Sequence, residues 1–499
     1  MQDFDAIVIG SGIGGLVAGS MLARYGKGVL VCESHTIAGG AAHSFWRRGF
    51  HFDSGPSFYC GLTDPRSFNP LRQVFDVLEE SIAAISYDPL GHYHFPEGSL
   101  PIYAEARSYL DAVAKFAPQG AVELQQFQQN LLVLYEALRG IPALALRSDW
   151  QLIPVLLSRY SPALLKLLPL VGAIAGSAGS LMDRDVRDPW VRRLIDLECF
   201  LLSGLKAHGT VAPEIAFMIG ERSRCAIEYP VGGSGAIVDA LVRGLQRWGG
   251  KLRLGTPVEQ ILVASGLTTG IRLQNGEIIR APIIISNATV WDTYTKLLRP
   301  EDLPESYRKS ALSMPAVDSF MHLHLGIKAE GIEGLTGHHV VVHDSKIDIT
   351  VPGNTCMISI PTVWDATLAP PGHHTVHAYT LEPYEGWEYG ELYQQKKQER
   401  SQSLFQALER IIPDLRSRIV VESIGTPLTH ARFLRRYQGT YGPAIAAGKG
   451  TFPGPQTPVK GLYRVGDSTM PGIGVPAVAA SGILCANTLV NSDVTAQFL

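Results

Sequence analysis

The fold of this chain is decided by its N-terminal stretch DAIVIGSGIGG, residues 5–15. The first six of these residues form an apolar run rich in branched side chains, which is typical of a buried parallel strand. The glycines that follow match G-x-G-x-x-G at Gly10, Gly12 and Gly15, and apolar residues continue at helical spacing. A second strand, GVLVCE, ends in Glu33. A strand, a glycine turn, a helix, a strand and an acid in this order predict the first βαβ unit of an α/β domain.

Each glycine of this turn has a physical reason to be there. Gly10 makes the tight turn, Gly12 lets a pyrophosphate approach the backbone, and Gly15 lets the helix pack closely on the strand. The helix N-terminus offers free N–H groups and a partial positive charge to phosphates. Glu33 follows Gly10 at the distance where an acid binds ribose hydroxyls, and it disfavours a ribose that carries a 2′-phosphate. We therefore predict a Rossmann-type dinucleotide-binding domain.

Length and composition narrow the function classes. The 499 residues provide for two or three domains. Hydrophobic residues make up 46% and charged residues 18%, below the usual fraction of about 25%, which excludes a disordered chain. A net charge of −3 argues against a nucleic-acid binder. Six cysteines without a C-x-x-C spacing predict neither disulfides nor a zinc site. We expect no signal peptide, because the strand pattern begins at Asp5.

The segment after Glu33 continues the motif with the pair Gly39-Gly40. This arrangement resembles the FAD-binding motif of the amine-oxidase and phytoene-desaturase flavoproteins. The resemblance implies that the dinucleotide is FAD rather than NAD. It also implies that the residues after Gly40 run beside the flavin.

Two later segments are expected to return to the same domain. Residues 225–295 contain a Gly-rich loop, a helix and a strand-like run, residues 283–289, that ends in small residues. In the resembling proteins the Val258 position contacts the adenine. Near the C-terminus a strand runs into Gly466-Asp467 ahead of a last helix, where the carboxylate can accept a ribityl hydroxyl and the helix N-terminus can stabilise reduced flavin. The expected cofactor-binding residues are Gly10, Gly12, Gly14, Gly15, Glu33, Ser34, Gly39, Gly40, Ala41, Val258, Asn287, Ala288, Gly466, Asp467, Gly474 and Val475.

These segments predict a two-domain organisation. An FAD-binding domain takes residues 1–75, 225–300 and 420–499, and an inserted α+β substrate domain takes 76–224 and 301–419. The most apolar region is 152–182. Its longest uncharged stretch would be about 24 Å long as a helix, which is shorter than the bilayer core of roughly 30 Å. We therefore expect core packing, an apolar lid or an interfacial segment rather than a membrane span.

Over nearly its full length the chain resembles the carotenoid-isomerase branch of the bacterial-type phytoene desaturase family, to which retinol saturase is related. The resemblance rests on ISNATVWD at 285–292, SIPTVWDATLAP at 359–370, THARF at 429–433 and GTYGP at 439–443. It implies an FAD enzyme that isomerises a poly-cis carotenoid from cis to trans with reduced flavin and without net redox change.

Three alternatives stay open: a desaturase, a saturase, and a non-catalytic prenyl or lipid carrier of the same fold. We expect peripheral attachment to the cytoplasmic face of a membrane, because the composition is apolar and no span is predicted. Neither the residues nor the resemblance identifies the electron donor or acceptor.

The catalytic candidates are Glu198, His430 and Arg432. Glu198 lies in the apolar run LIDLECFLL and could act as a general acid, or it could be a buried acid paired with Arg192 or Arg193. His430 and Arg432 belong to THARF and could stand near the flavin or form structural contacts. His322 and His324 share one face of a predicted strand, but metal binding needs a third ligand that the sequence does not reveal. We therefore predict no metal site.

Overall fold

A computed structural model describes residues 3–55 and 57–499 of the chain, so the first two residues and residue 56, which fall in the predicted segment 1–75, lie outside it. Its first sheet is five-stranded, in the order β10-β2-β1-β14-β20, and every neighbouring pair is parallel. Ile9 at the end of β1 pairs with Cys32 of β2 and with Ser286 of β14. The strands are β1 (Ala6–Ile9), β2 (Val29–Cys32), β10 (Lys251–Arg253), β14 (Ile283–Ser286) and β20 (Leu462–Arg464).

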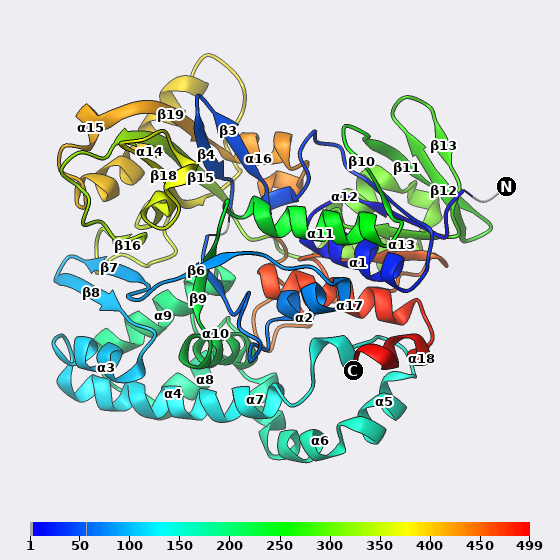
Figure 1. Cartoon of the computed structure of the whole chain (residues 1–499), viewed down its shortest axis with the longest axis horizontal. Helices are drawn as coiled ribbons and strands as arrows, with labels where there is room; N and C mark the ends of the chain where they lie inside the picture. The colour runs from blue at the N-terminus through cyan, green and yellow to red at the C-terminus, as the bar shows by residue number, and fades with distance from the viewer. Residues whose placement is uncertain (1–2, 56) are drawn as a thin grey trace.

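Three parts of the chain that are far apart in sequence therefore meet in this sheet, and Figure 1 shows blue, green and red segments side by side there. Helix α1 (Ile13–Arg24) is buried over almost its whole length between α11 (Gly235–Arg247) and α17 (Val475–Thr488). Gly482 makes this close packing possible, because a Cβ there would lie 2.7 Å from the Cβ of Val17. Helix α2 (Pro70–Leu78) packs against all three of these helices.

The second sheet has seven strands in the order β19-β15-β18-β17-β16-β7-β8 and is antiparallel except for the pair β16 and β7. The alternating residues of FMHLHLGI at 320–327 and TCMISI at 355–360 predict two strands of a mixed sheet, and the structure forms β15 and β17 there. The strands are β7 (Gly91–Phe95), β8 (Gly98–Ile102), β15 (Ser319–Lys328), β16 (His338–Val342), β17 (Thr355–Ser359), β18 (His373–Glu382) and β19 (Ile419–Gly425).

The two faces of this sheet differ. On β15 the side chains of Met321, Leu323 and Leu325 belong to the apolar core under helix α14 (Tyr393–Glu409). The alternate residues, which include Phe320 and His322, point to the opposite face, where they line a cavity. Since β19 continues to Gly425, this sheet extends a few residues past the predicted domain boundary at 420. The domain boundaries themselves remain a prediction.

A helical layer completes the molecule and encloses an apolar core of its own. It contains α3 (Ala106–Ala114), α4 (Pro118–Leu138), α8 (Ala178–Asp185), α9 (Pro189–Ser203) and α10 (Ala212–Arg224). The remaining elements, mostly short, are β3 (Ser44–Arg47), β4 (Phe50–Asp53), β5 (Tyr59–Cys60), β6 (Ala84–Ser86), β9 (Ile227–Pro230), β11 (Val258–Ala264), β12 (Leu267–Leu273), β13 (Ile278–Ile279), α12 (Val290–Asp292), α13 (Glu305–Leu312), α15 (Leu415–Arg418), α16 (Pro427–Phe433) and α18 (Ser492–Thr495).

The apolar region 152–182 forms short helices at the edge of the molecule. Helices α5 (Leu152–Arg159), α6 (Ser161–Leu167) and α7 (Val171–Ala175) contain no buried residue. Figure 1 shows α5 and α6 along the lower edge, near the C-terminus. Within the described residues, no single helix is long and apolar enough to cross a membrane, although Leu152–Arg159 and Ser161–Ala175, bent by 96°, pass the length and composition criteria together.

Candidate functional site

A cavity of about 880 Å³ lies where the two sheets approach each other. The loops at the carboxyl ends of β1, β2, β14 and β20 form one part of its wall, and the seven-stranded sheet and the end of α9 form another. Crevices at the carboxyl ends of parallel strands are where α/β sheets bind ligands. The volume lies within the range of about 300–1,000 Å³ that is usual for small-molecule and cofactor sites.

The glycine turn after β1 is packed against the end of β14 without room for side chains. A Cβ on Gly12 would lie 2.6 Å from Nδ2 of Asn287, and one on Gly14 would lie 2.9 Å from the backbone of Gly466. A Cβ on Gly15 would collide with the carbonyl oxygen of Gly10. The turn therefore keeps its backbone open to the cavity, as a pyrophosphate cradle requires.

Glu33 lies at the cavity wall and is held by four hydrogen bonds. Its Oε2 accepts from the backbone N–H of Ser11 at 2.8 Å and from the Ser11 hydroxyl at 2.7 Å. Its Oε1 accepts from the backbone N–H of His35 at 2.8 Å and from the Ser34 hydroxyl at 3.2 Å. These bonds hold the carboxylate beside the turn, where an acid can bind the hydroxyls of a ribose.

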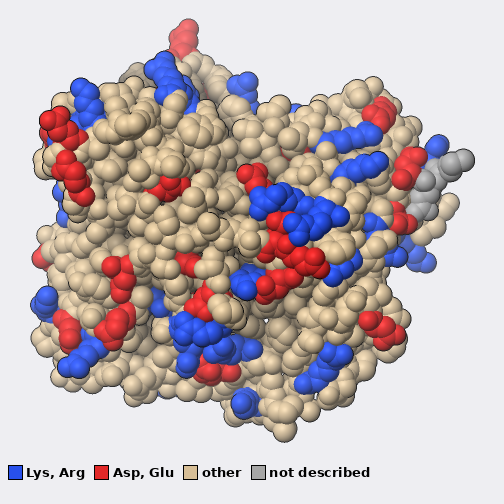
Figure 2. All heavy atoms as spheres, in the orientation of Figure 1, with Lys and Arg blue, Asp and Glu red and all other residues tan. Residues whose placement is uncertain are grey.

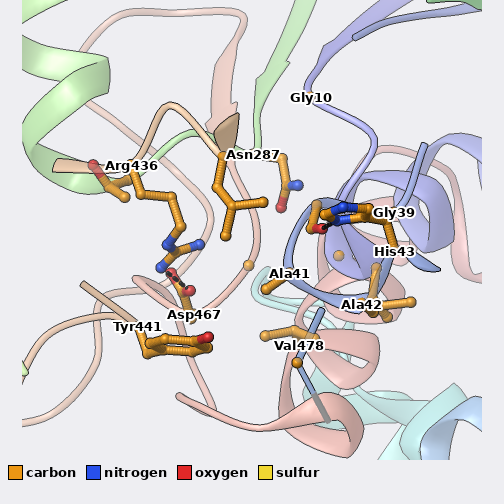
Figure 3. Close-up of a pocket in the computed structure, with 18 of the residues that line it drawn as sticks. Gly10, Gly39, Ala41, Ala42, His43, Asn287, Arg436, Tyr441, Asp467 and Val478 are labelled. Carbon is orange, nitrogen blue, oxygen red and sulfur yellow. Dashed lines mark hydrogen bonds and ion pairs between the residues drawn. The ribbon is translucent and has the colours of Figure 1, made fainter. Parts of the chain in front are cut away.

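The Gly39-Gly40 segment crosses the same end of the cavity. Gly39 has φ +114° and its N–H donates to the carbonyl of Ser11 at 3.0 Å, while a Cβ on Gly40 would lie 3.1 Å from Cα of Gly12. The chain then passes Ala41 and Ala42 to His43, whose Nδ1 lies 2.7 Å from the Gly40 carbonyl oxygen. Figure 3 shows this segment beside the labelled turn residue Gly10 and opposite Val478 of α17.

The C-terminal segment closes the cavity from the other side. Asp467 pairs with Arg436, and Figure 3 shows the guanidinium reaching across to the carboxylate beside Tyr441. Gly474 has φ +100° and precedes the first turn of α17, which begins at Val475 and carries no acidic residue. A helix N-terminus at this place favours a negatively charged ligand group.

The structure brings together almost all of the expected cofactor-binding residues. All of them except Gly15 line the cavity, and Gly15 lies directly behind the wall in contact with Gly10. Glycine backbone, a carboxylate placed where it can bind a ribose and a helix N-terminus make a donor and acceptor set that fits an FAD molecule.

The part of the cavity beyond this end is apolar. Phe200, Leu201 and Leu202 come from the end of α9, and Phe320, Met357 and Leu381 come from the seven-stranded sheet. Among the described lining residues, those between 76 and 224 and between 301 and 419 include no Asp, Glu, Lys or Arg. The charged lining residues all belong to the nucleotide-binding segments, so the cavity changes from charged to uncharged along its length.

Burial keeps several titratable groups around the cavity neutral. Burial lowers the pKa of His322 well below its usual value and raises the pKa of Tyr379 to about 12. The pKa of Tyr441 is raised, and that of His43 lowered, for the same reason. A side chain that would have to be charged in a low-dielectric wall shifts its pKa until it is uncharged.

Glu198 does not reach this cavity. The residue is 3% exposed, and its carboxylate lies in the helical core, where it accepts hydrogen bonds from Arg222 at 3.0 Å and from the Tyr109 hydroxyl at 3.1 Å. The partner is therefore Arg222 of α10 and neither Arg192 nor Arg193, which bind other groups. The spacing of Glu198 and Arg222 in the sequence could not reveal this ion pair, because the pair forms only when α9 packs against α10.

The other two catalytic candidates also stand apart from the cavity wall. The imidazole of His430 is buried behind it and stacks on His322 with ring centroids 4.4 Å apart. Arg432 is exposed on α16, with its guanidinium 5.5 Å from the ring centroid of Phe433. Three residues that sequence reasoning missed, His43, Tyr441 and Arg436, do line the cavity. Tyr441 belongs to the motif GTYGP, and Arg436 lies between THARF and GTYGP. Their position in this motif region was the only sign in the sequence that they could belong to the site.

The fold and the site define a dinucleotide-binding protein of the flavoenzyme type, whose cavity extends from the nucleotide-binding loops to an uncharged wall. Residues 13–490 match the family described as flavin containing amine oxidoreductase, and the chain belongs to this family. Its fold class is therefore confirmed, and its cofactor is FAD.

Relatives of known sequence cover almost the whole chain. Prolycopene isomerase 2, chloroplastic, of an Oncidium hybrid cultivar is 35% identical over 97% of this chain and 84% of its own length. The neurosporene-forming phytoene desaturase of Rhodobacter capsulatus is 27% identical over 97% of this chain and 93% of its own. The crystal structure of an oxidoreductase from Methanosarcina mazei has a TM-score of 0.63 at 21% identity, covering 96% of this chain and 98% of that one. The last likeness concerns the fold alone.

Proposed function

We propose that the chain is an FAD-dependent isomerase that converts a poly-cis carotenoid to a form with more trans double bonds, without net redox change. The observation that carries this proposal is a single cavity that joins a dinucleotide site to an apolar wall without charged side chains. A long polyene is apolar and has no group for a charged side chain to recognise. The relatedness to prolycopene isomerases supports the same substrate class.

Each part of the cavity has a task in this reaction. Phe320, Met357 and Leu381 bind the polyene by apolar contact and exclude water, which strengthens electrostatic interactions inside the cavity. The first turn of α17 and Arg436 would hold a negatively charged cofactor ring. Bound FAD supplies a redox-active ring that can donate or accept electrons. In an isomerisation the polyene must leave with the electrons and protons that it brought.

The experiment is an anaerobic incubation of the flavin-loaded protein with a poly-cis carotene, carried out with oxidised and with reduced FAD. We expect a change of isomer at unchanged mass, seen by chromatography and mass spectrometry, only with reduced FAD. A loss of two mass units would instead identify a desaturase, which the relatedness to phytoene desaturases makes the second candidate, and a gain of two would identify a saturase. An unchanged carotene would contradict all three.

We further propose that helices α5 to α7 contact the surface of a membrane, where such a substrate dissolves. The side chains of Ile153, Leu157, Leu165 and Leu168 are each at least 60% exposed. Figure 2 shows the edge over α6 as largely uncharged surface interrupted by cationic side chains, and Arg159 and Lys166 belong to these helices. Exposed apolar groups next to cations suit an interfacial position among lipid headgroups. Co-sedimentation with anionic liposomes tests this proposal, and recovery of all protein in the supernatant would contradict it.

A further inference from the structure

Three histidines share one place on the cavity side of the seven-stranded sheet. His322 and His324 are two residues apart on β15, so their side chains point to the same face. The antiparallel neighbour β18 places His377 directly opposite His324. One ring nitrogen of each of the three histidines lies within 4.8 Å of the others. The structure thereby provides the third ligand that the sequence alone could not reveal.

The nitrogens of this cluster are buried and incompletely bonded. The three residues are 2%, 7% and 3% exposed, in sequence order. Within the described part of the chain, Nε2 of His322 and Nδ1 of His377 have no hydrogen-bond partner. These two nitrogens are the ones opposite the nitrogens that face each other, so each can carry the proton of its ring while the other nitrogen binds a metal ion.

The surroundings favour the metal-binding form of these rings. Nε2 of His324 lies 3.1 Å from the backbone carbonyl oxygen of Asp53, which only accepts, so Nε2 carries the proton and Nδ1 has the free lone pair. A hydrogen bond from the far nitrogen to a carbonyl is the usual support of a ligating histidine.

We propose that His322, His324 and His377 bind one first-row transition metal ion, for which Zn²⁺ is the probe. Nitrogen ligands of zinc lie at about 2.0–2.1 Å, and three histidines with an open fourth position make a known kind of catalytic site. His322 lines the cavity, so the open position is on that side. A polyene has no lone pair to offer, and water therefore takes that position.

Binding requires a modest rearrangement of the rings. Nδ1 of His322 and Nε2 of His377 are 2.8 Å apart, and one of them donates a proton to the other. When both nitrogens bind the metal ion, this proton moves to the other nitrogen of its own ring, so both imidazoles stay neutral. The rings of His324 and His377 are stacked with an angle of 4° between their planes, so their lone pairs do not yet converge. The rings must turn about their Cβ–Cγ bonds, torsions that are broad for histidine.

The test measures metal content and affinity on the FAD-loaded full-length protein. After exposure to Zn²⁺ and removal of free ion, we expect about one zinc per chain by mass spectrometry. The variants His324→Gln and His377→Gln should each bind Zn²⁺ at least about tenfold more weakly, since each lacks one of three ligands. The control is His94→Gln, which disrupts a second imidazole pair on the same sheet, His94 with His339, and should leave the affinity unchanged.

Co²⁺ provides a second readout, because its visible spectrum reports coordination by the three nitrogens. FAD content and thermal unfolding of each variant establish that it is folded. The proposal is overturned if the wild-type protein binds no zinc, if it binds no more than the triple variant His322→Gln, His324→Gln, His377→Gln, or if His94→Gln loses as much. None of these measurements uses isomerase activity, so the metal site can fail while the proposed function stands.

Discussion

At the scale of single residues, the site depends on glycines, because the backbone segments that form it pack too closely for a Cβ atom. Gly14 and Gly15 let the start of α1 approach the ends of β1 and β20 so closely that the backbone itself forms the cavity wall. Asn287 completes this packing from β14, with its side chain within 3.7 Å of the Cβ positions of both Gly10 and Gly12. A substitution here acts on cofactor binding and on stability together.

Gly15→Ala should therefore reduce both properties. Its Cβ meets the carbonyl oxygen of Gly10, a backbone atom that cannot turn away. Overpacking of this kind costs about 1–3 kcal/mol of unfolding free energy, and the displaced turn should retain less FAD per chain. Absorbance of the purified protein and urea unfolding measure the two effects. The control Gly172→Ala adds a Cβ with no neighbour within 4 Å and should lower neither property, since alanine in place of glycine favours the helix.

Glu198→Gln separates a structural role from a catalytic one. The substitution leaves the Arg222 guanidinium, 6% exposed, without its counter-charge. Removing one member of a buried ion pair costs about 3–5 kcal/mol, so the urea midpoint should fall markedly. The turnover of the protein that remains folded should stay at the wild-type value, and a large loss of turnover would contradict the structural role. Breaking the exposed pair of Arg253 and Glu277 should cost at most about 1 kcal/mol.

Residues of the local motif could be predicted from the sequence, whereas residues that depend on tertiary packing could not. Gly10, Gly12 and Glu33 are recognisable because the strand, turn and helix that need them are contiguous in the chain. The partner of Glu198 and the approach of Arg436 to Asp467 arise from packing between distant elements, and no spacing in the sequence encodes them.

At the scale of elements, α5 to α7 are unusual because they are apolar without being buried. Their hydropathy predicts a lid, core packing or an interfacial segment, and only the structure shows which side chains are exposed. For β15 the alternation in sequence predicts a strand with two different faces. The sequence could not predict that β18 would be its neighbour, and with it the position of His377.

The double variant Leu157→Glu, Leu168→Glu should weaken binding to anionic liposomes by at least about tenfold. Each change replaces an exposed apolar side chain by an anion, which removes apolar burial of about 1.5–3 kcal/mol and adds repulsion from lipid phosphate. Co-sedimentation at several lipid concentrations measures the partition. The control Leu392→Glu changes another exposed leucine, directly before α14, and should have no effect, because α14 lies on the other side of the molecule from α5 and α6 in Figure 1. Equal losses in both proteins would contradict the assignment of the contact surface.

At the scale of the whole molecule, the nucleotide-binding sheet joins strands from the two ends and the middle of the chain. Three motifs reveal β1, β2, β14 and β20 in the sequence, because each motif must present particular residues to one cofactor, whereas no motif marks the edge strand β10. The seven-stranded sheet has no such shared ligand to mark its strands, so its order could not be predicted. Many side chains of the seven-stranded sheet are histidines, and several of them are buried. The unfolding free energy should therefore depend on pH.

Stability should therefore fall as the pH drops from about 6.5 to 4. Burial lowers the pKa to about 4 for His324, His338 and His94, and to about 3 for His339 and His430, from the usual value of about 6.5. In this window the unfolded chain binds protons that the folded chain excludes, so the unfolding free energy decreases with falling pH. Each fully excluded proton contributes about 1.4 kcal/mol per pH unit. Above about pH 6.5 these rings are neutral in both the folded and the unfolded chain, so the unfolding free energy no longer depends on their protonation.

Urea unfolding followed by far-ultraviolet circular dichroism at pH 7.5, 6.5, 5.5 and 4.5 measures this dependence. We expect similar midpoints at the two higher values and a steep decline below them. Carboxylates with lowered pKa, such as Asp149 and Asp185, act in the same direction only at lower pH, because their ordinary value is near 4. His94→Gln removes one of the titrating groups and should make the decline shallower by up to about 1.4 kcal/mol per pH unit. A midpoint that does not change between pH 7.5 and 4.5 would show that these imidazoles are protonated in the folded protein.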